Sequence, residues 1–174
     1  EGVRRSPGGA TGAAQYGVSA NGSLIYVPGS AGSTSAQLDI VVAERSGALT
    51  ALKLPPGSYE SPRVSPDGKR ITFGTQETKE TIVWTFDLAG TSAIQRLTFV
   101  GANRFPIWSA DRKPETYQSE PVKDLGIFWQ LADGTGAVER LTKANTGESQ
   151  EPEAWSPLPN RVLLYSVRKG NDVT

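Results

Sequence analysis

The feature that most constrains this chain is a repeat of about 45 residues. A serine that ends a short apolar stretch occurs at Ser19 and returns at Ser65, Ser109 and Ser156, at intervals of 46, 44 and 47 residues. The segments around these serines read YGVSANG, PRVSPDG, PIWSADR and AWSPLPN, and each is followed by an aromatic residue: Tyr26, Phe73, Tyr117 or Tyr165. A fixed period of this length indicates a row of similar supersecondary units.

Each complete repeat contains the signals of four short strands. After the aromatic residue and a variable loop comes a β-branched or aromatic run, then a glycine turn, then a closing strand. The runs cover 38–42, 81–86 and 126–131, the turns hold Gly47, Gly90 and Gly134, and the closing strands cover 48–54, 93–99 and 137–143. A four-stranded unit cannot bury both of its faces alone. The sequence therefore predicts an all-β chain, a β-propeller of four-stranded antiparallel blades packed on one another.

The repeats divide the chain into about three and a half blades. We expect residues 1–14 to be a flexible lead-in and the blades to cover 15–60, 61–104, 105–150 and, in part, 151–174. Two arrangements are open: a partial propeller that belongs to a larger one, or half of a ring that two copies assemble. The absence of methionine indicates a processed chain or an excised segment.

Within the blades, the sequence makes three local predictions. Asp67-Gly68 should form the turn between the first and second strands. Four tryptophans should fill the space between stacked blades: Trp84, Trp108, Trp129 and Trp155. In the third repeat Pro114 stands where the second strand should begin, which predicts a shortened or irregular strand, because proline cannot donate to the ladder.

Composition and missing motifs exclude several classes of function. Lys+Arg and Asp+Glu are both 18, so no basic surface for nucleic acid is expected. The chain has no cysteine and no histidine, and it lacks kinase, serine-hydrolase, phosphate-loop and calcium-loop motifs. We therefore expect no catalytic residues, no cofactor and no metal. No apolar run approaches the roughly 20 residues that a membrane helix needs, so no direct membrane insertion is expected.

The repeats resemble those of TolB-type propellers. SPRVSPDGKRITF (Ser61–Phe73) is similar to the central motif of that family, and the resemblance covers roughly Gln15–Val167. The N-terminal EGVRRS and AQYGVSANGSLIYVPG resemble propeller regions that follow the kinase domain in some bacterial serine/threonine kinases. Similar blades form the propellers of prolyl-oligopeptidase-type peptidases. The resemblance implies a WD-like repeat, a ring of six or more blades and a periplasmic or other extracytoplasmic location, with the cytoplasm left open.

Candidate binding residues lie near the start of the inner strands. In a propeller, the loops between second and third strands share a face with the loops between blades, and a rigid scaffold often displays binding residues there. The candidates for this rim are Tyr59, Glu60, Asn103, Arg104, Phe105 and Glu151.

The leading hypothesis is a non-catalytic module that binds a protein or peptide partner or senses a ligand. Two alternatives stay open: the gating propeller of a prolyl-oligopeptidase-type peptidase whose hydrolase domain is absent, or a structural subunit of a larger assembly. Self-association to complete a ring is a further possibility.

Overall fold

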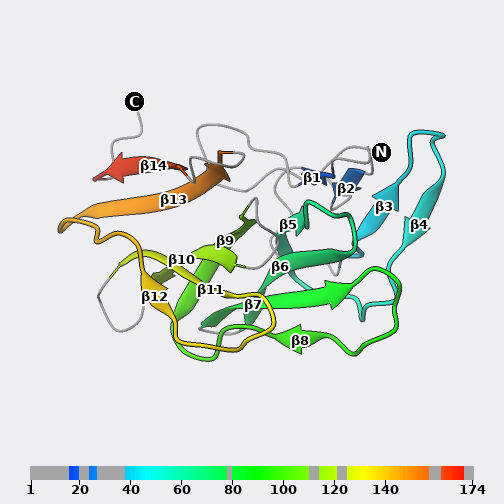
Figure 1. Ribbon diagram of the computed structural model, residues 1–174, viewed down its shortest axis with the longest axis horizontal. Helices are drawn as coiled ribbons and strands as arrows, with labels where there is room; N and C mark the ends of the chain where they lie inside the picture. Colours follow the sequence, from blue (N-terminus) through cyan, green and yellow to red (C-terminus); the bar gives the residue numbers. More distant parts are fainter. Residues whose placement is uncertain are drawn as a thin grey trace.

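A computed structural model describes residues 16–19, 24–26, 38–77, 80–109, 114–120, 125–156 and 162–170. All of its regular elements are strands, which confirms the all-β prediction (Figure 1). They are β1 (Tyr16–Val18), β2 (Leu24–Tyr26), β3 (Val41–Ala43), β4 (Leu49–Ala51), β5 (Tyr59–Val64), β6 (Arg70–Glu77), β7 (Glu80–Asp87), β8 (Gln95–Arg96), β9 (Ala102–Trp108), β10 (Pro114–Glu120), β11 (Gly126–Leu131), β12 (Glu139–Arg140), β13 (Glu148–Trp155) and β14 (Leu163–Lys169). The expected lead-in, 1–14, lies outside the described residues.

The strands group by repeat into blades. Strands β1 to β4 form one antiparallel sheet in chain order. Strands β5 to β8 and β9 to β12 form the next two blades, joined by one parallel pair between Thr81 of β7 and Ala102 of β9. The hairpin β13–β14 begins a fourth blade. The inner strands β1, β5, β9 and β13 contact one another in succession, as expected when blades are stacked around an axis (Figure 1).

The repeated serine–aspartate signature closes the turn between the first two strands of a blade. The Ser65 hydroxyl donates to Asp67 Oδ1 at 2.6 Å, and the amides of Lys69 and Arg70 donate to Asp67 Oδ1 and Ser65 Oγ. Gly68 has a φ of 71°, which glycine adopts without steric cost. In the fourth blade, Ser156 Oγ accepts the amide of Val162 at 2.8 Å. The predicted turn is confirmed, and the role of the serine and aspartate of the signature is to stabilise this turn.

Each of the inner strands β5, β9 and β13 carries a β-bulge at its proline: Pro62, Pro106 and Pro152. The pairing register shifts between Glu60 and Arg63 in β5 and between Pro152 and Ala154 in β13. In β9 the shift lies opposite Thr116 and Gln118. The residues before the first two prolines, Ser61 and Phe105, have positive φ values of 47° and 54°.

The second strand of the third blade differs from its prediction. β10 covers Pro114–Glu120, seven residues, so the expected shortening is wrong. Proline is tolerated because it is the first residue of the strand, where a ladder donor is not required. The expected irregularity at Pro114 is also absent, because β10 pairs with β11 in unbroken register from Pro114 to Ser119 and the extra residue of the bulge between β9 and β10 lies in β9.

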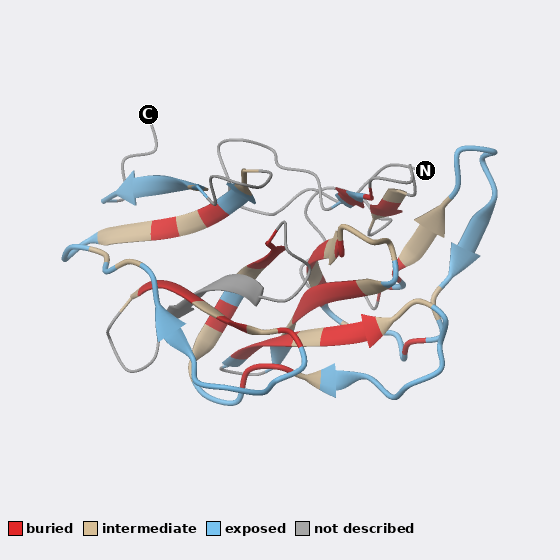
Figure 2. Ribbon diagram, in the orientation of Figure 1, coloured by how far each residue is buried: buried red, intermediate tan, exposed pale blue. Residues whose placement is uncertain are grey.

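The core lies between blades (Figure 2). The larger cluster joins the first two blades, and its buried members are Ile25, Leu38, Ile40, Leu54, Tyr59, Val64, Ile71, Phe73 and Phe86. A smaller cluster of Val83, Leu97 and Phe128 joins the second and third blades. Burial between neighbouring sheets is therefore what holds the blades together.

The tryptophans differ in how far they fill the space between blades. Trp108 is buried, its Nε1 donates to the carbonyl of Arg63 in the preceding blade at 3.2 Å, and Arg70 lies over its ring at 5.1 Å. Trp84 is half-buried and packs against the larger core cluster. Trp129 and Trp155 are also half-buried, and the Trp129 indole donates to Glu139 within its own blade. The expected role between blades is thus fulfilled most completely by Trp108.

Candidate binding surface

The candidate surface is the end of the molecule at which the inner strands begin. We call this end the rim, and it comprises the first residues of β5, β9 and β13 with the connections that precede them. The six candidate residues were expected in loops, but all lie inside strands, because β5, β9 and β13 begin at Tyr59, Ala102 and Glu148. The bulges allow strand pairing to continue past the prolines at which a strand would otherwise end.

Two of the six candidates have structural roles. The Tyr59 ring is 4 % exposed, meets the Phe73 ring edge-on at 5.2 Å, and its hydroxyl donates to the carbonyl of Pro55. Burial, with a smaller contribution from Asp39, raises the pKa of Tyr59. Asn103 is 2 % exposed, and its amide donates to the carbonyls of three residues: Thr81, Val100 and Gly101. Neither side chain is available to a ligand in this structure.

The other candidates present side chains at the surface. Arg104 is exposed, and its guanidinium donates across the blade boundary to Thr81 Oγ1 at 3.3 Å and Gln76 Oε1 at 3.5 Å. Glu60 and Phe105 are half-buried, on β5 and β9. Within the described residues, no hydrogen bond or ion pair joins Glu60, Arg104 and Glu151 to one another.

Next to the rim, Arg63 binds the first blade and the charges of the fourth blade act on it. Arg63, in the middle of β5, donates from Nη1 to the carbonyl of Tyr16 on β1 at 3.1 Å. Burial lowers the pKa of Arg63, whereas the carboxylates of Glu151 and Glu153 on β13 raise it. Burial raises the pKa of Glu151, as does Glu153, while Arg168 and Arg63 oppose this shift. We call Arg63, Glu151 and Glu153 the inner-strand charge cluster.

Sequence reasoning missed Arg63. It is the second residue of the repeated segment PRVS, and the third repeat has Ile107 at the same place in PIWS. A charged residue at a position that is apolar in a sister repeat was the available signal. Arg63 was read as part of a turn motif, so this signal was not used.

The described residues were also compared with two kinds of functional feature: metal sites and membrane-spanning helices. Among them, no group of three or more histidine, cysteine, aspartate or glutamate side chains could hold a metal ion. Across the same residues, we find no helix with the length and apolar character needed to span a bilayer. What the rim does provide is a set of charged and aromatic side chains held on strands, which is the kind of surface that proteins use for recognition.

Comparison with solved structures shows which known folds this chain is similar to. A protein designated TolB from Agrobacterium tumefaciens matches with a TM-score of 0.61 and 26% identity, over 75% of this chain and 49% of that one. TolB from Acinetobacter baumannii matches with a TM-score of 0.62 and 21% identity, over 92% of this chain and 44% of that one. No family model and no curated protein matches the sequence.

A peptidase propeller is also similar. The β-propeller domain of the Trilobed protease from Pyrococcus furiosus, described as having an open velcro topology, matches with a TM-score of 0.56 and 14% identity, over 90% of this chain and 54% of that domain. The chain spans about half of the length of the TolB structures it matches. These findings confirm a TolB-type β-propeller fold, of which this chain is a partial propeller.

Proposed function

We propose that this chain is a non-catalytic propeller module that binds a protein or peptide partner at its rim, outside the cytoplasm. The observation that carries the proposal is the inner-strand charge cluster, in which the carboxylate charges of Glu151 and Glu153 in the fourth blade act on the half-buried Arg63 of the second. Charges are costly to remove from water, so a scaffold that needed only stability would place apolar residues there. A few convergent polar groups on a rigid frame are typical of a recognition site.

The similarity to TolB supports this function and an extracytoplasmic location. In both TolB structures the matched region is a part of a longer chain. Partner identity and residue roles are therefore proposed from the rim of this chain alone.

The test compares two ends of the same molecule. The chain, a rim variant (Glu60→Gln with Glu151→Gln) and a matched variant of the opposite end (Asp87→Asn with Asp133→Asn) are immobilised and exposed to the soluble extracytoplasmic proteins of the source cell. Both variants remove two carboxylate charges. Asp87 is the last residue of β7 and Asp133 lies in the turn after β11, and each accepts a backbone amide of its turn. We expect a polypeptide that the unaltered chain and the turn variant retain and the rim variant loses. Equal retention by all three would contradict binding at the rim.

The second candidate function, a gating propeller of a peptidase, is favoured by one observation: the similarity to the propeller domain of the Trilobed protease. It predicts a hydrolase domain, with a catalytic serine and histidine, next to this segment in the parent protein. A kinase domain before the segment would instead favour the sensing role that the N-terminal resemblance implies. The sequence of the parent gene decides between them.

A further inference from the structure

The connection between the second and third blades exposes two consecutive apolar side chains. Phe99 and Val100 are each 66 % exposed, the highest exposure among the large apolar residues of the described chain. Val18 and Leu164, which are nearly as exposed, lie on the two end blades, which have no further blade against them in this structure. Ile94, Val138 and Leu141, on the second and third blades, are less exposed, at 37 to 51 %. Phe99 and Val100 lie at an internal boundary, where both neighbouring blades are present. Blade stacking therefore does not account for their exposure.

The scaffold does not require an aromatic residue at this point. The closing strand reads Leu-Thr-Phe at Phe99, whereas the sister repeats read Leu-Lys-Leu at Leu54 and Leu-Thr-Lys at Lys143. Leu54 is buried in the core and Lys143 is exposed. Among these three closing segments, an exposed phenylalanine occurs only at this boundary. Aromatic residues, phenylalanine included, are enriched at protein interfaces.

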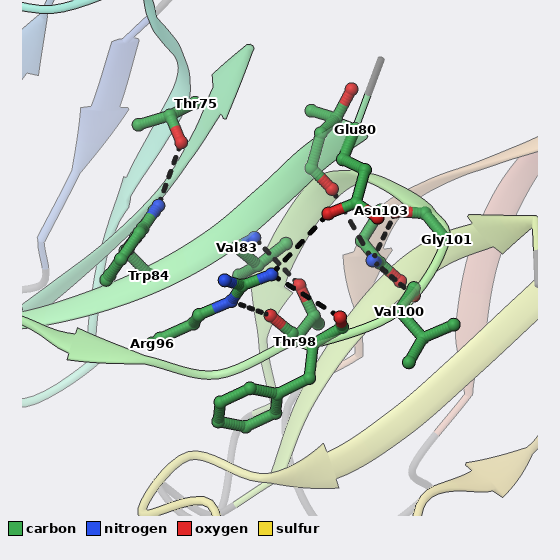
Figure 3. Close-up of polar contacts among 11 residues, drawn as sticks. Thr75, Glu80, Val83, Trp84, Arg96, Thr98, Val100, Gly101 and Asn103 are labelled. Carbon is green, nitrogen blue, oxygen red and sulfur yellow. Dashed lines mark hydrogen bonds and ion pairs between the residues drawn. The ribbon is translucent and has the colours of Figure 1, made fainter. Parts of the chain in front are cut away.

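The backbone that carries the two side chains is held by hydrogen bonds from two residues (Figure 3). Arg96 donates to the carbonyls of Thr98 at 2.7 Å and Phe99 at 3.4 Å, and its guanidinium lies 5.3 Å from the Phe99 ring centroid. Asn103 donates to the carbonyls of Val100 at 3.0 Å and Gly101 at 3.1 Å. Four consecutive carbonyl groups are thus bound by side chains.

This fixation lowers the entropic cost of binding. A loop already ordered in the free protein loses less conformational freedom when a partner docks. Arg96 is itself held by an ion pair with Glu80, at 3.7 Å. We call Phe99 and Val100, with the backbone from Thr98 to Gly101, the apolar patch.

A cation suited to a carboxylate lies beside the apolar patch. Arg104 donates only to neutral oxygens within the described residues, those of Thr81 and Gln76, at 3.3 and 3.5 Å. Asn103, which binds the carbonyl of Val100, also donates to the carbonyl of Thr81 at 3.4 Å. Arg104 and the apolar patch are therefore linked through Thr81 and Asn103, and Arg104 follows Val100 by four residues in the chain.

We propose that the apolar patch and Arg104 together dock an extended segment of a partner protein in which an apolar side chain lies within a few residues of a carboxylate. The apolar side chain packs on Phe99 and Val100, and the carboxylate replaces the neutral oxygens as the acceptor of the Arg104 guanidinium. Guanidinium–carboxylate pairs are stronger than guanidinium hydrogen bonds to neutral oxygens, which favours this exchange. The proposal rests on the proposed function, since it names the class of partner for the rim.

The test uses a defined peptide and amide resonances of the full chain. The probe is acetyl-Gly-Ser-Leu-Leu-Gly-Asp-Gly-amide, added to millimolar concentration, with an Asn-for-Asp peptide and a Ser-Ser-for-Leu-Leu peptide as controls. We expect saturable shifts centred on residues 98–105, weakened about tenfold or more by either control peptide. Phe99→Ser and Arg104→Gln should each weaken binding to a similar degree. The matched controls Val138→Ser and Arg45→Gln, at other exposed positions, should leave it unchanged.

Several results would overturn the proposal. These are the absence of saturable shifts, shifts centred elsewhere, equal binding of the Asp and Asn peptides, or a Phe99→Ser chain that binds as before. Concentration-dependent sedimentation that Phe99→Ser abolishes would assign the patch to a second copy instead. If the captured partner of the preceding section is lost with Glu60 and Glu151 but not with Phe99, this inference fails while the proposed function stands.

Discussion

Replacing Gly17 with alanine tests how closely the inner strands of the first two blades pack. A Cβ atom at Gly17 would lie 3.2 Å from three backbone atoms of β5: the Pro62 carbonyl oxygen, Arg63 Cα and the Val64 nitrogen. The end of a flexible side chain could move away, but backbone atoms of a paired strand cannot. β1 and β5 would therefore separate by a few tenths of an ångström.

The expected loss of stability is about 2 kcal/mol. Inserting a methyl group into a packed interface typically costs about 1–3 kcal/mol. The same separation would lengthen the hydrogen bond from Arg63 Nη1 to the carbonyl of Tyr16, now 3.1 Å, and a bond of this kind contributes about 1 kcal/mol. For a chain of this size, a loss of about 2 kcal/mol lowers the melting temperature by about 4–8 °C.

Thermal unfolding followed by circular dichroism, with a urea titration, measures this loss. Gly74→Ala is the matched control, because a Cβ atom there would make only ordinary contacts, 3.6 Å from the carbonyl oxygen of Glu60 and 3.7 Å from its Cβ. Its stability should be unchanged or higher by about 0.4–1 kcal/mol, since alanine restricts the unfolded chain. If the Gly17→Ala chain melts at the same temperature as the unaltered protein, β1 and β5 do not pack as closely as the structure indicates. If both variants lose the same stability, the cause of the loss is not specific to β1.

Three shorter predictions concern buried hydrogen bonds and pH. Thr98→Val removes the acceptor of the buried Val83 amide and should cost about 1–3 kcal/mol in urea unfolding. The hydrogen bond from the Ser65 hydroxyl lowers the pKa of Asp67, so the ionised Asp67 stabilises the folded state above pH 3.8. This stabilisation is lost as the pH falls through the lower pKa of Asp67 in the folded state, and Asp67→Asn should reduce the loss of stability in acid. Burial raises the pKa of Glu151, so ionisation of its carboxyl group destabilises the folded state as the pH rises above 4.5. Glu151→Gln should therefore raise the melting temperature at neutral pH but not in acid.

The strands could be located from the sequence because their pairing is local. The apolar run predicted over 126–131 is β11, and the run over 81–86 lies within β7. Each is followed by a turn whose glycine has a positive φ: Gly90 at 67° after β7 and Gly134 at 75° after β11. Hairpin turns fix the register of neighbouring strands, so four short signals in order specify a blade.

The roles of individual rim residues could not be predicted, because they depend on contacts between blades. Tyr59 was expected at the surface, yet its ring completes the core with Phe73, which is 14 residues later in the sequence and on the paired strand. Phe99 was expected as the end of a closing strand, but that strand is only Gln95–Arg96, so Phe99 falls in the connection. Neither the length of a closing strand nor the depth of a side chain follows from periodicity.

The bulge in β5 explains how one strand can serve both the core and the charged surface. Glu60 pairs with Gly74 and Arg63 with Thr72, two positions that share one face of β6. Tyr59 pairs with Thr75 and Val64 with Ile71, on the opposite face. Strict alternation would instead place Arg63 on the same face as Tyr59, which is buried in the core.

The extra residue at the bulge therefore separates the two sets of side chains. It keeps the apolar pair, Tyr59 and Val64, in the core cluster and puts the charged pair, Glu60 and Arg63, together on the other face. Its backbone cost is the positive φ of Ser61, which is 47°, and Phe105 repeats this feature at 54° in the next blade. Backbone strain of this kind persists only where the surrounding structure enforces it. Because the residue of β9 that matches Arg63 is the buried Ile107, the bulge belongs to the repeat, and the charged pair is an addition of the second blade.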